Sequence, residues 1–176
     1  GLGTMGAPMA RNLLKAGHAL RVFDVSAEAR AALAEAGAVP AETALAAAEG
    51  ADFVITMLPN DAIVSAVHLG PEGLIETLAA RPLLIDCSTI SPDTSRALSR
   101  AAATRGFGMI DAPVSGGPGG ATDATLSFMV GGSEADFARA EPILQAMGRM
   151  IVHAGDSGAG QVAKLCNNMT AAVVMA

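Results

Sequence analysis

The sequence predicts an α/β protein with a doubly wound, mostly parallel sheet, on the strength of three observations. Short apolar segments alternate with helical segments along the chain. The segments 53–58 and 83–87 are apolar at most positions, which is typical of parallel strands covered on both faces. The chain also opens on three glycines in six residues, and a helical pattern follows at once. We therefore expect a sheet with helices packed on both sides.

The first half of the chain contains the start and stop signals of four helices and two strands. Met5, Met9 and Leu13 recur every four residues and predict a helix over 5–16, ended by Gly17. Ser26 is a good N-cap for the next helix, which we expect to run to about residue 36. The predicted strands are 20–24 and 53–58, and the remaining predicted helices are 41–48 and 62–68.

The second half continues the alternation. Ser91-Pro92 predicts a helix start, because proline suits the first helical turn, and this helix should reach about residue 104. Ser133 caps a helix predicted to run to about residue 147. The expected strands are 83–87, 107–110, 126–130 and 150–153, and a last helix should begin near Gly160.

Composition excludes several classes of function. The chain has 176 residues, 51% hydrophobic and 16% charged, which is enough to bury a core. A net charge of -6 without clustered Lys or Arg argues against a nucleic-acid partner. No apolar run reaches the length of about 18 residues that a membrane span needs. Two unpaired cysteines and three scattered histidines predict no disulfide and no metal site, and favour a cytoplasmic protein.

The glycine pattern at the start is typical of a Rossmann-like dinucleotide site. Gly1 would make the tight turn, Gly3 would let a pyrophosphate approach the backbone, and Gly6 would let the helix pack close to the sheet. Asp24 ends the next strand, where an acid binds the adenosine ribose. Its charge would repel a 2′-phosphate, so NAD is favoured over NADP. An ordinary glycine turn and a solvated Asp24 are the alternatives.

Three residues after predicted strands are further candidates for contacts with the cofactor. Leu58 and Pro59 follow one buried strand, and Thr89 follows another. Ligands of open α/β sheets bind at the carboxyl ends of the strands. We expect Leu58 and Pro59 to pack on the cofactor and Thr89 to bond the nicotinamide ribose. Each could instead have a purely structural role, and Cys87 is most simply a buried small residue.

A second glycine-rich segment, residues 113–120, is predicted to be a binding loop. Ser115 offers a hydroxyl, and Gly116 and Gly117 leave backbone N–H groups uncovered. Such a concavity suits an anion, for example a carboxylate. A flexible surface loop is the alternative.

Lys164 is the candidate acid/base. It is one of two lysines, and it lies in an otherwise uncharged helical segment where Asn167 and Asn168 would share its face. Desolvation lowers the pKa of a lysine toward working pH, as a base that takes a hydroxyl proton requires. Cys166 should point elsewhere and pack. An exposed lysine whose stem covers apolar surface is the alternative.

Taken together, six ordered motifs resemble the β-hydroxyacid dehydrogenase family, over nearly the whole chain. The motifs are Gly-Leu-Gly-Thr-Met-Gly-Ala-Pro-Met-Ala, Met-Leu-Pro, Asp-Cys-Ser-Thr-Ile, Asp-Ala-Pro-Val-Ser-Gly-Gly, Phe-Met-Val-Gly-Gly and Gly-Gln-Val-Ala-Lys-Leu-Cys-Asn-Asn. The resemblance implies a catalytic role for Lys164, a substrate-orienting role for Asn168, and carboxylate binding by Ser115, Gly116 and Gly117. It puts cofactor contacts at eight positions: Gly1, Gly3, Met5, Gly6, Asp24, Leu58, Pro59 and Thr89.

The resemblance further implies NAD-dependent oxidation of a small β-hydroxy acid, most closely of 3-hydroxyisobutyrate to methylmalonate semialdehyde in valine catabolism. It implies an NAD-binding domain over 1–159, with 160–176 opening the helix that leads to a second, all-helical domain. We expect that domain, and the strand before Gly1, to be missing from this sequence. The family forms most of its subunit contact through the helical domain, so we expect a homo-oligomer.

Three alternatives stay open. On the same scaffold, a reductase of tartronate semialdehyde, or of glyoxylate and succinic semialdehyde, is the nearest. The latter usually favours NADPH, which Asp24 disfavours. A nucleotide-binding module without catalysis would keep the glycine loop but would have no need of Lys164, Asn168 and Ser115. A decarboxylating enzyme of the phosphogluconate type should carry basic residues for a phosphate, mostly outside this sequence.

Overall fold

The protein folds into two sheets, a small parallel one and a larger mixed one, flanked by helices. The structure is a computed structural model and describes residues 1–175. Within that part of the chain, β1 (Arg21–Val22) and β2 (Val39–Pro40) form a two-stranded parallel sheet. A six-stranded sheet has the order β3-β4-β5-β7-β6, and β8 also pairs with β7. The mostly parallel, Rossmann-like architecture predicted from the sequence is confirmed.

The large sheet changes direction at its centre. Three neighbouring strands are parallel: β3 (Phe53–Thr56), β4 (Leu83–Asp86) and β5 (Met109–Asp111). The next strand, β7 (Leu126–Gly131), is antiparallel to β5 and to the short β6 (Val114–Ser115). The last strand, β8 (Gly148–Gly155), is parallel to β7. The carboxyl ends of β3, β4 and β5 therefore meet at one edge of the sheet.

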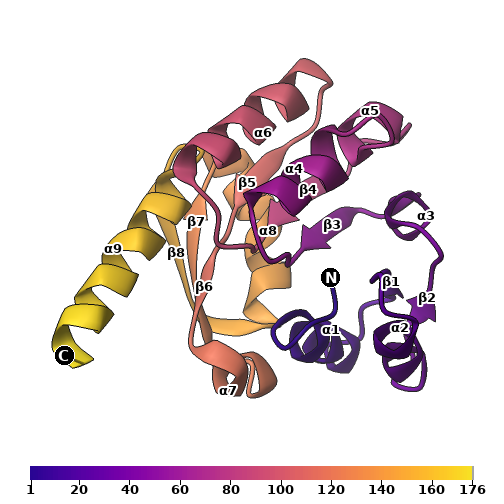
Figure 1. The fold of residues 1–176 in the computed structure, drawn as a ribbon, viewed down its shortest axis with the longest axis horizontal. Helices are drawn as coiled ribbons and strands as arrows, with labels where there is room; N and C mark the ends of the chain where they lie inside the picture. Colours follow the sequence, from indigo (N-terminus) through magenta and orange to yellow (C-terminus); the bar gives the residue numbers. More distant parts are fainter. Residues whose placement is uncertain (176) are drawn as a thin grey trace.

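Helices cover both faces of this sheet, as Figure 1 shows. On one side lie α4 (Asp61–Leu69), α5 (Leu74–Thr77) and α6 (Pro92–Thr104). On the other lie α1 (Gly6–Lys15), α7 (Gly117–Thr122) and α8 (Glu134–Gln145). The smaller sheet is joined to α2 (Ala27–Ala34) and α3 (Ala44–Ala48). The last helix, α9 (Ala159–Met175), starts on the sheet and extends away from it.

Strand β4 shows why its first three residues are all apolar. Leu83 and Ile85 face the core beneath α1 and α8, whereas Leu84 faces the core beneath α4, α5 and α6. Successive side chains of a strand point to opposite faces, so a strand covered on both sides must be apolar at successive positions. The structure thus confirms the double coverage inferred from the sequence.

The start of the chain lies between the two sheets. The backbone N–H of Leu2 donates to Asp24 Oδ2, just after β1, over 2.6 Å. A Cβ atom on Gly1 would clash with the backbone oxygen of Met57, just after β3. Gly1 and Leu2 therefore bridge the small sheet and the large one.

The main differences from the predicted elements involve short segments. The pairing of Val39 with Arg21 and the short helix α5 were not predicted. The segment 113–120, predicted to be a loop, instead contributes to β6 and forms the first part of α7. Packing fixes this helix despite its glycines, since Ala121 is fully buried and its carbonyl accepts a 2.7 Å bond from Asn12 Nδ2 of α1.

Candidate functional site

The glycine loop has the geometry that a pyrophosphate site requires. A Cβ on Gly6 would clash with the carbonyl oxygen of Gly1, so the helix can pack this closely only with glycine there. Gly3 is exposed, and a Cβ built on it would meet no atom within 4 Å. Packing explains Gly1 and Gly6, but nothing in the described residues occupies the space beside Gly3. That open space fits a ligand, and the residues present therefore fit a dinucleotide.

Asp24 is fixed beside this loop by backbone donors. Its two carboxylate oxygens accept hydrogen bonds from Leu2 N at 2.6 Å and from Ser26 N at 2.8 Å. Partial burial raises the pKa of Asp24, but these two hydrogen bonds and the nearby charge of Arg30 together leave the pKa below its usual value. Asp24 is therefore a charged acceptor at the place where the ribose of a dinucleotide is expected. Met5, the other predicted contact at the loop, is half-buried just before α1.

The remaining predicted cofactor residues lie on two neighbouring loops. Leu58 is half-buried and Pro59 exposed after β3, and Thr89 is exposed after β4. The two loops are joined by a hydrogen bond of 2.9 Å from Leu58 N to Ser88 Oγ. Ser88 in turn donates to the buried carboxyl group of Asp86 over 2.6 Å. The structure thus brings the loops of Leu58 and Thr89 together at the carboxyl edge of the sheet.

Beneath these loops lies a chain of buried polar groups that was not anticipated. Thr56 Oγ1 donates to Asp86 Oδ1 over 2.7 Å and lies 3.3 Å from His68 Nε2. Since the hydroxyl proton is used toward Asp86, His68 donates to Thr56, and its ring is neutral with the proton on Nε2. Burial lowers the pKa of His68 to about 4 and raises that of Asp86. These residues support the loops of Leu58 and Thr89 from below.

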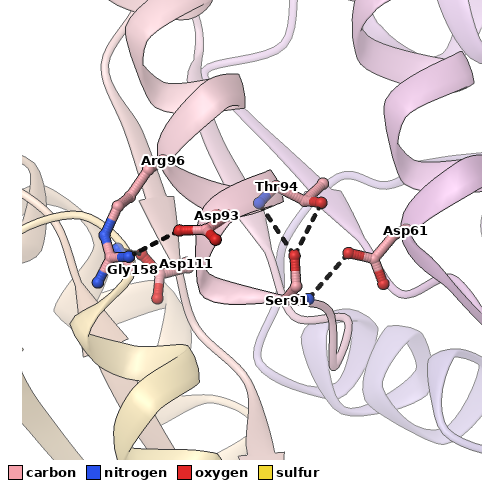
Figure 2. Close-up of polar contacts among 7 residues, drawn as sticks. All are labelled: Asp61, Ser91, Asp93, Thr94, Arg96, Asp111 and Gly158. Atoms are coloured by element: carbon pink, nitrogen blue, oxygen red, sulfur yellow. Dashed lines mark hydrogen bonds and ion pairs between the residues drawn. The ribbon is translucent and has the colours of Figure 1, made fainter.

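The Thr89 loop is also held from the side by α4. The backbone N–H of Ser91 donates to Asp61 Oδ1 over 2.9 Å, and the Ser91 hydroxyl caps α6 by accepting from Thr94 N at 3.1 Å (Figure 2). Pro92 follows at the first turn, as predicted. In the same view Arg96 extends from α6 toward Gly158, the residue just before α9.

Lys164 is buried at the start of α9, with 9% of its surface exposed. Burial lowers the pKa of its ammonium group, which is the direction expected of an acid/base. No ion pair among the described residues involves Lys164. Lys164 is thus buried in the structure and not an exposed lysine. The prediction that Cys166 packs is wrong, because its thiol lies on the exposed side of α9.

The predicted substrate residues lie on two elements that meet. Ser115 is half-buried at the end of β6, and its Oγ accepts a 3.2 Å hydrogen bond from Asn167 Nδ2 of α9. Asn168 is exposed one residue further on. Gly116 and Gly117 are exposed and have positive φ angles of 130° and 61°, which favour glycine. The helix of Lys164 and the Ser115 segment therefore share one face of the molecule.

Two residues with central contacts were missed by sequence reasoning, Asp111 and Gln161. Both are buried, and both bind backbone groups 47 to 73 residues away in the chain. Within residues 1–175 no group of three or more potential ligands could hold a metal ion. Likewise, none of the helices there is long and apolar enough to cross a membrane.

Comparison with known proteins gives consistent results. The chain is 57% identical over 176 residues to a 3-hydroxyisobutyrate dehydrogenase of Pseudomonas aeruginosa, covering 100% of this chain and 59% of that protein. It is 52% identical to an NAD-dependent L-serine dehydrogenase of the same organism, covering 99% of this chain and 59% of the relative. The structure of a Mycobacterium tuberculosis 3-hydroxyisobutyrate dehydrogenase with L-serine is 45% identical, with a TM-score of 0.93 over 98% of this chain and 58% of the other.

The chain thus spans about three fifths of the length of these relatives. A family model described as the NAD binding domain of 6-phosphogluconate dehydrogenase matches residues 1–155. This match covers the glycine loop, Asp24, the loops of Leu58 and Thr89, and the whole six-stranded sheet. Fold, loop geometry and the matched range agree, and the chain belongs to the family of the NAD binding domain of 6-phosphogluconate dehydrogenase.

Proposed function

We propose that this chain is the cofactor-binding part of an NAD-dependent dehydrogenase that reversibly oxidises 3-hydroxyisobutyrate to methylmalonate semialdehyde. The observation that carries the proposal is the buried Lys164, which forms no ion pair within residues 1–175 and lies on a helix that also contacts Ser115 through Asn167. The likeness to the Pseudomonas aeruginosa 3-hydroxyisobutyrate dehydrogenase supports the same substrate. In a cell this reaction belongs to valine catabolism.

Lys164 acts as the base in the oxidation. NAD, when bound, accepts the hydride that leaves the hydroxyl-bearing carbon. The substrate O–H proton passes to the neutral amine of Lys164, the C–H bond breaks, and the C=O bond of the aldehyde forms. In the reverse direction the ammonium group returns the proton to the developing alkoxide. The lowered pKa of Lys164 raises the fraction of neutral amine at working pH.

Ser115, Gly116 and Gly117 bind the substrate carboxylate, and Asn168 orients its hydroxyl. Asn167 donates to the Ser115 oxygen, so the Ser115 hydroxyl proton is free to point at a carboxylate. Gly116 and Gly117 add backbone N–H groups that no side chain covers.

Three loops would hold the cofactor: the glycine loop before α1, the loop after β3 and the loop after β4. Gly1, Gly3, Met5 and Gly6 surround the pyrophosphate. Asp24 accepts from the ribose hydroxyls and disfavours the 2′-phosphate of NADP, because its carboxylate is charged and its pKa is held low. Leu58 and Pro59 pack on the cofactor, and Thr89 bonds the nicotinamide ribose.

L-Serine is a second candidate substrate, favoured by the 52% identity to an NAD-dependent L-serine dehydrogenase. Serine and 3-hydroxyisobutyrate share a primary hydroxyl β to a carboxylate and differ in the group on the α carbon. Tartronate semialdehyde is a third candidate, on the resemblance alone. The division into 1–159 and 160–176, a homo-oligomer formed through a further helical domain, and a cytoplasmic location stay predictions of this proposal.

The test is a substrate panel on the full-length protein, with NAD or NADP reduction followed at 340 nm. We expect 3-hydroxyisobutyrate to have the highest kcat/KM, and NAD to exceed NADP. A higher kcat/KM for L-serine, or for glycerate, the alcohol form of tartronate semialdehyde, would transfer the assignment to that substrate. Tight NADH binding without turnover of any hydroxy acid would instead identify a nucleotide-binding module without catalysis.

A further inference from the structure

Gln161 lies in the first turn of α9, fully buried, and its side chain bonds to the loop after β4. Its Nε2 donates to the carbonyl of Ser88 over 2.8 Å, and its Oε1 accepts from Ile90 N at 3.2 Å. These two backbone groups stand immediately before and after Thr89. The amide of Gln161 therefore fixes the peptide groups on both sides of a residue that the proposed function places against the cofactor.

The backbone of Gln161 is fixed as well. Asp111, at the end of β5, accepts from Gly158 N at 2.7 Å and from Gln161 N at 3.0 Å (Figure 2 shows the first bond). A Cβ on Gly160 would lie 2.8 Å from Asp111 Oδ2, so the helix start is seated directly on the strand ends. The first turn of α9 thus has no freedom to slide along the sheet.

Lys164 follows Gln161 by three residues, which puts both side chains on the same side of the helix. The C-terminal part of α9 lacks comparable support within the described residues, and Met169 is 70% exposed. The position of Lys164 therefore depends on the first turn of α9, which is anchored by the side chains of Gln161 and Asp111.

We propose that Gln161 is a positioning residue that sets the distance between the Thr89 loop and Lys164, and so between the bound cofactor and the acid/base. This inference rests on the proposed function. The hydride leaves the carbon that bears the hydroxyl group, and the proton leaves that hydroxyl. The cofactor and the base must therefore be placed correctly relative to each other, since misplacement by about 1 Å costs on the order of 100-fold in rate. The amide of Gln161, which joins the Thr89 loop to the helix that carries Lys164, meets that need.

The experiment compares Gln161→Met with the matched control Gln145→Met in the full-length protein. Methionine keeps the length of glutamine and removes both hydrogen bonds, and Gln145 is an exposed residue of α8. The readouts are kcat, KM for NAD, NADH affinity, and the deuterium isotope effect on kcat with substrate deuterated at the reacting carbon. We expect Gln161→Met to lower kcat by about 10- to 100-fold, because the reacting groups are misaligned. Its isotope effect should rise, and the control should match the wild type.

Unchanged kcat and isotope effect in the folded Gln161→Met protein would overturn the inference. So would a lower thermal midpoint with normal kcat per folded molecule, since that result describes a structural role alone. If Gln161→Met does not fold, Gln161→Asn replaces it, because asparagine keeps an amide in place but cannot reach both partners. Absence of hydroxy acid oxidation in the wild type would remove the proposed function together with this inference, whereas an active wild type with an unaffected variant removes only the inference.

Discussion

The two glycine-rich segments of the protein look alike in the sequence but owe their glycines to different causes. In the first, Gly1 and Gly6 have no room for a Cβ because backbone atoms lie against them. In the second, a Cβ on Gly116 would make a tight contact of 3.2 Å with the flexible side chain of Leu126, and the backbone there adopts a φ of 130° that other residues avoid. Backbone packing therefore selects glycine at positions 1 and 6, whereas backbone conformation is the main reason for glycine at position 116.

Gly6→Ala should have the largest effect. The new methyl group would overlap the carbonyl oxygen of Gly1, so α1 must move away from the loop. Overpacking of this kind costs about 3 kcal/mol in unfolding free energy. The NADH affinity should fall with it, because the loop itself is displaced. Urea denaturation and NADH titration of the full-length protein measure the two effects, and wild-type values for both would contradict the packing argument.

Gly116→Ala should have the next largest effect. Alanine at this φ costs about 1–2 kcal/mol, because its Cβ crowds the neighbouring carbonyl. The substitution should mainly impair binding of the hydroxy acid. The KM for the hydroxy acid should rise, while the KM for NAD stays near the wild-type value. An equal rise in both constants would show that the two segments do not serve different ligands.

Gly3→Ala should leave the stability of the protein nearly unchanged and weaken the binding of the cofactor. Its Cβ would meet no protein atom, so we expect a change within about 0.5 kcal/mol in unfolding free energy. The methyl group would occupy the space assigned to the pyrophosphate, and we expect roughly tenfold weaker NADH binding. Calorimetric titration checks this, and wild-type affinity would mean that the open space beside Gly3 is not the phosphate site.

Acidification should distinguish the segments further, through Asp24. Its pKa is lowered in the fold, so it stabilises the protein above its ordinary pKa near 3.8, and this contribution is lost as pH falls through the lower folded value. The unfolding free energy of the wild type should therefore fall more steeply in acid than that of Asp24→Asn. Parallel pH curves for the two proteins would rule out a pH-dependent link between Asp24 and the first segment.

Gly119→Ala should have the smallest effect, and a favourable one. Gly119 lies inside α7 with no atom within 4 Å of a built Cβ and without a positive φ. Alanine there reduces the freedom of the unfolded chain and should stabilise the protein by about 0.5 kcal/mol. A thermal scan would show a small upward shift. A large loss of stability would mean that α7 depends on its glycines.

The sequence predicted the order of the long helices and buried strands because their apolar periods and caps are local signals. Four predicted helices have a side-chain cap in the structure, at Ser26, Asn60, Ser91 and Ser133. All of these except Asn60 were predicted as helix starts from the sequence. Helix α7 was missed because glycine and proline disfavour helices, and its packing against α1 and β7 is a tertiary contact that the local sequence does not reveal.

For the site, the sequence indicated the residues that carry a chemical pattern and missed those that support them. Lys164 was recognisable as a charge in an apolar helix. Gln161 and Asp111 gave no such signal, because their partners lie 47 to 73 residues away and only the fold brings them together. His68 gave no signal in the sequence beyond a scattered histidine, although it is buried beneath the loops of Leu58 and Thr89.

The most direct test of the proposed acid/base is the turnover of Lys164→Ala beside Lys15→Ala in the full-length protein. These are the two lysines of the chain, and Lys15 is exposed at the end of α1. We expect Lys164→Ala to lose at least about 100-fold in kcat for 3-hydroxyisobutyrate while it keeps wild-type NADH affinity, and Lys15→Ala to remain fully active. Near-normal turnover by Lys164→Ala would contradict the assignment and leave its burial without a catalytic role.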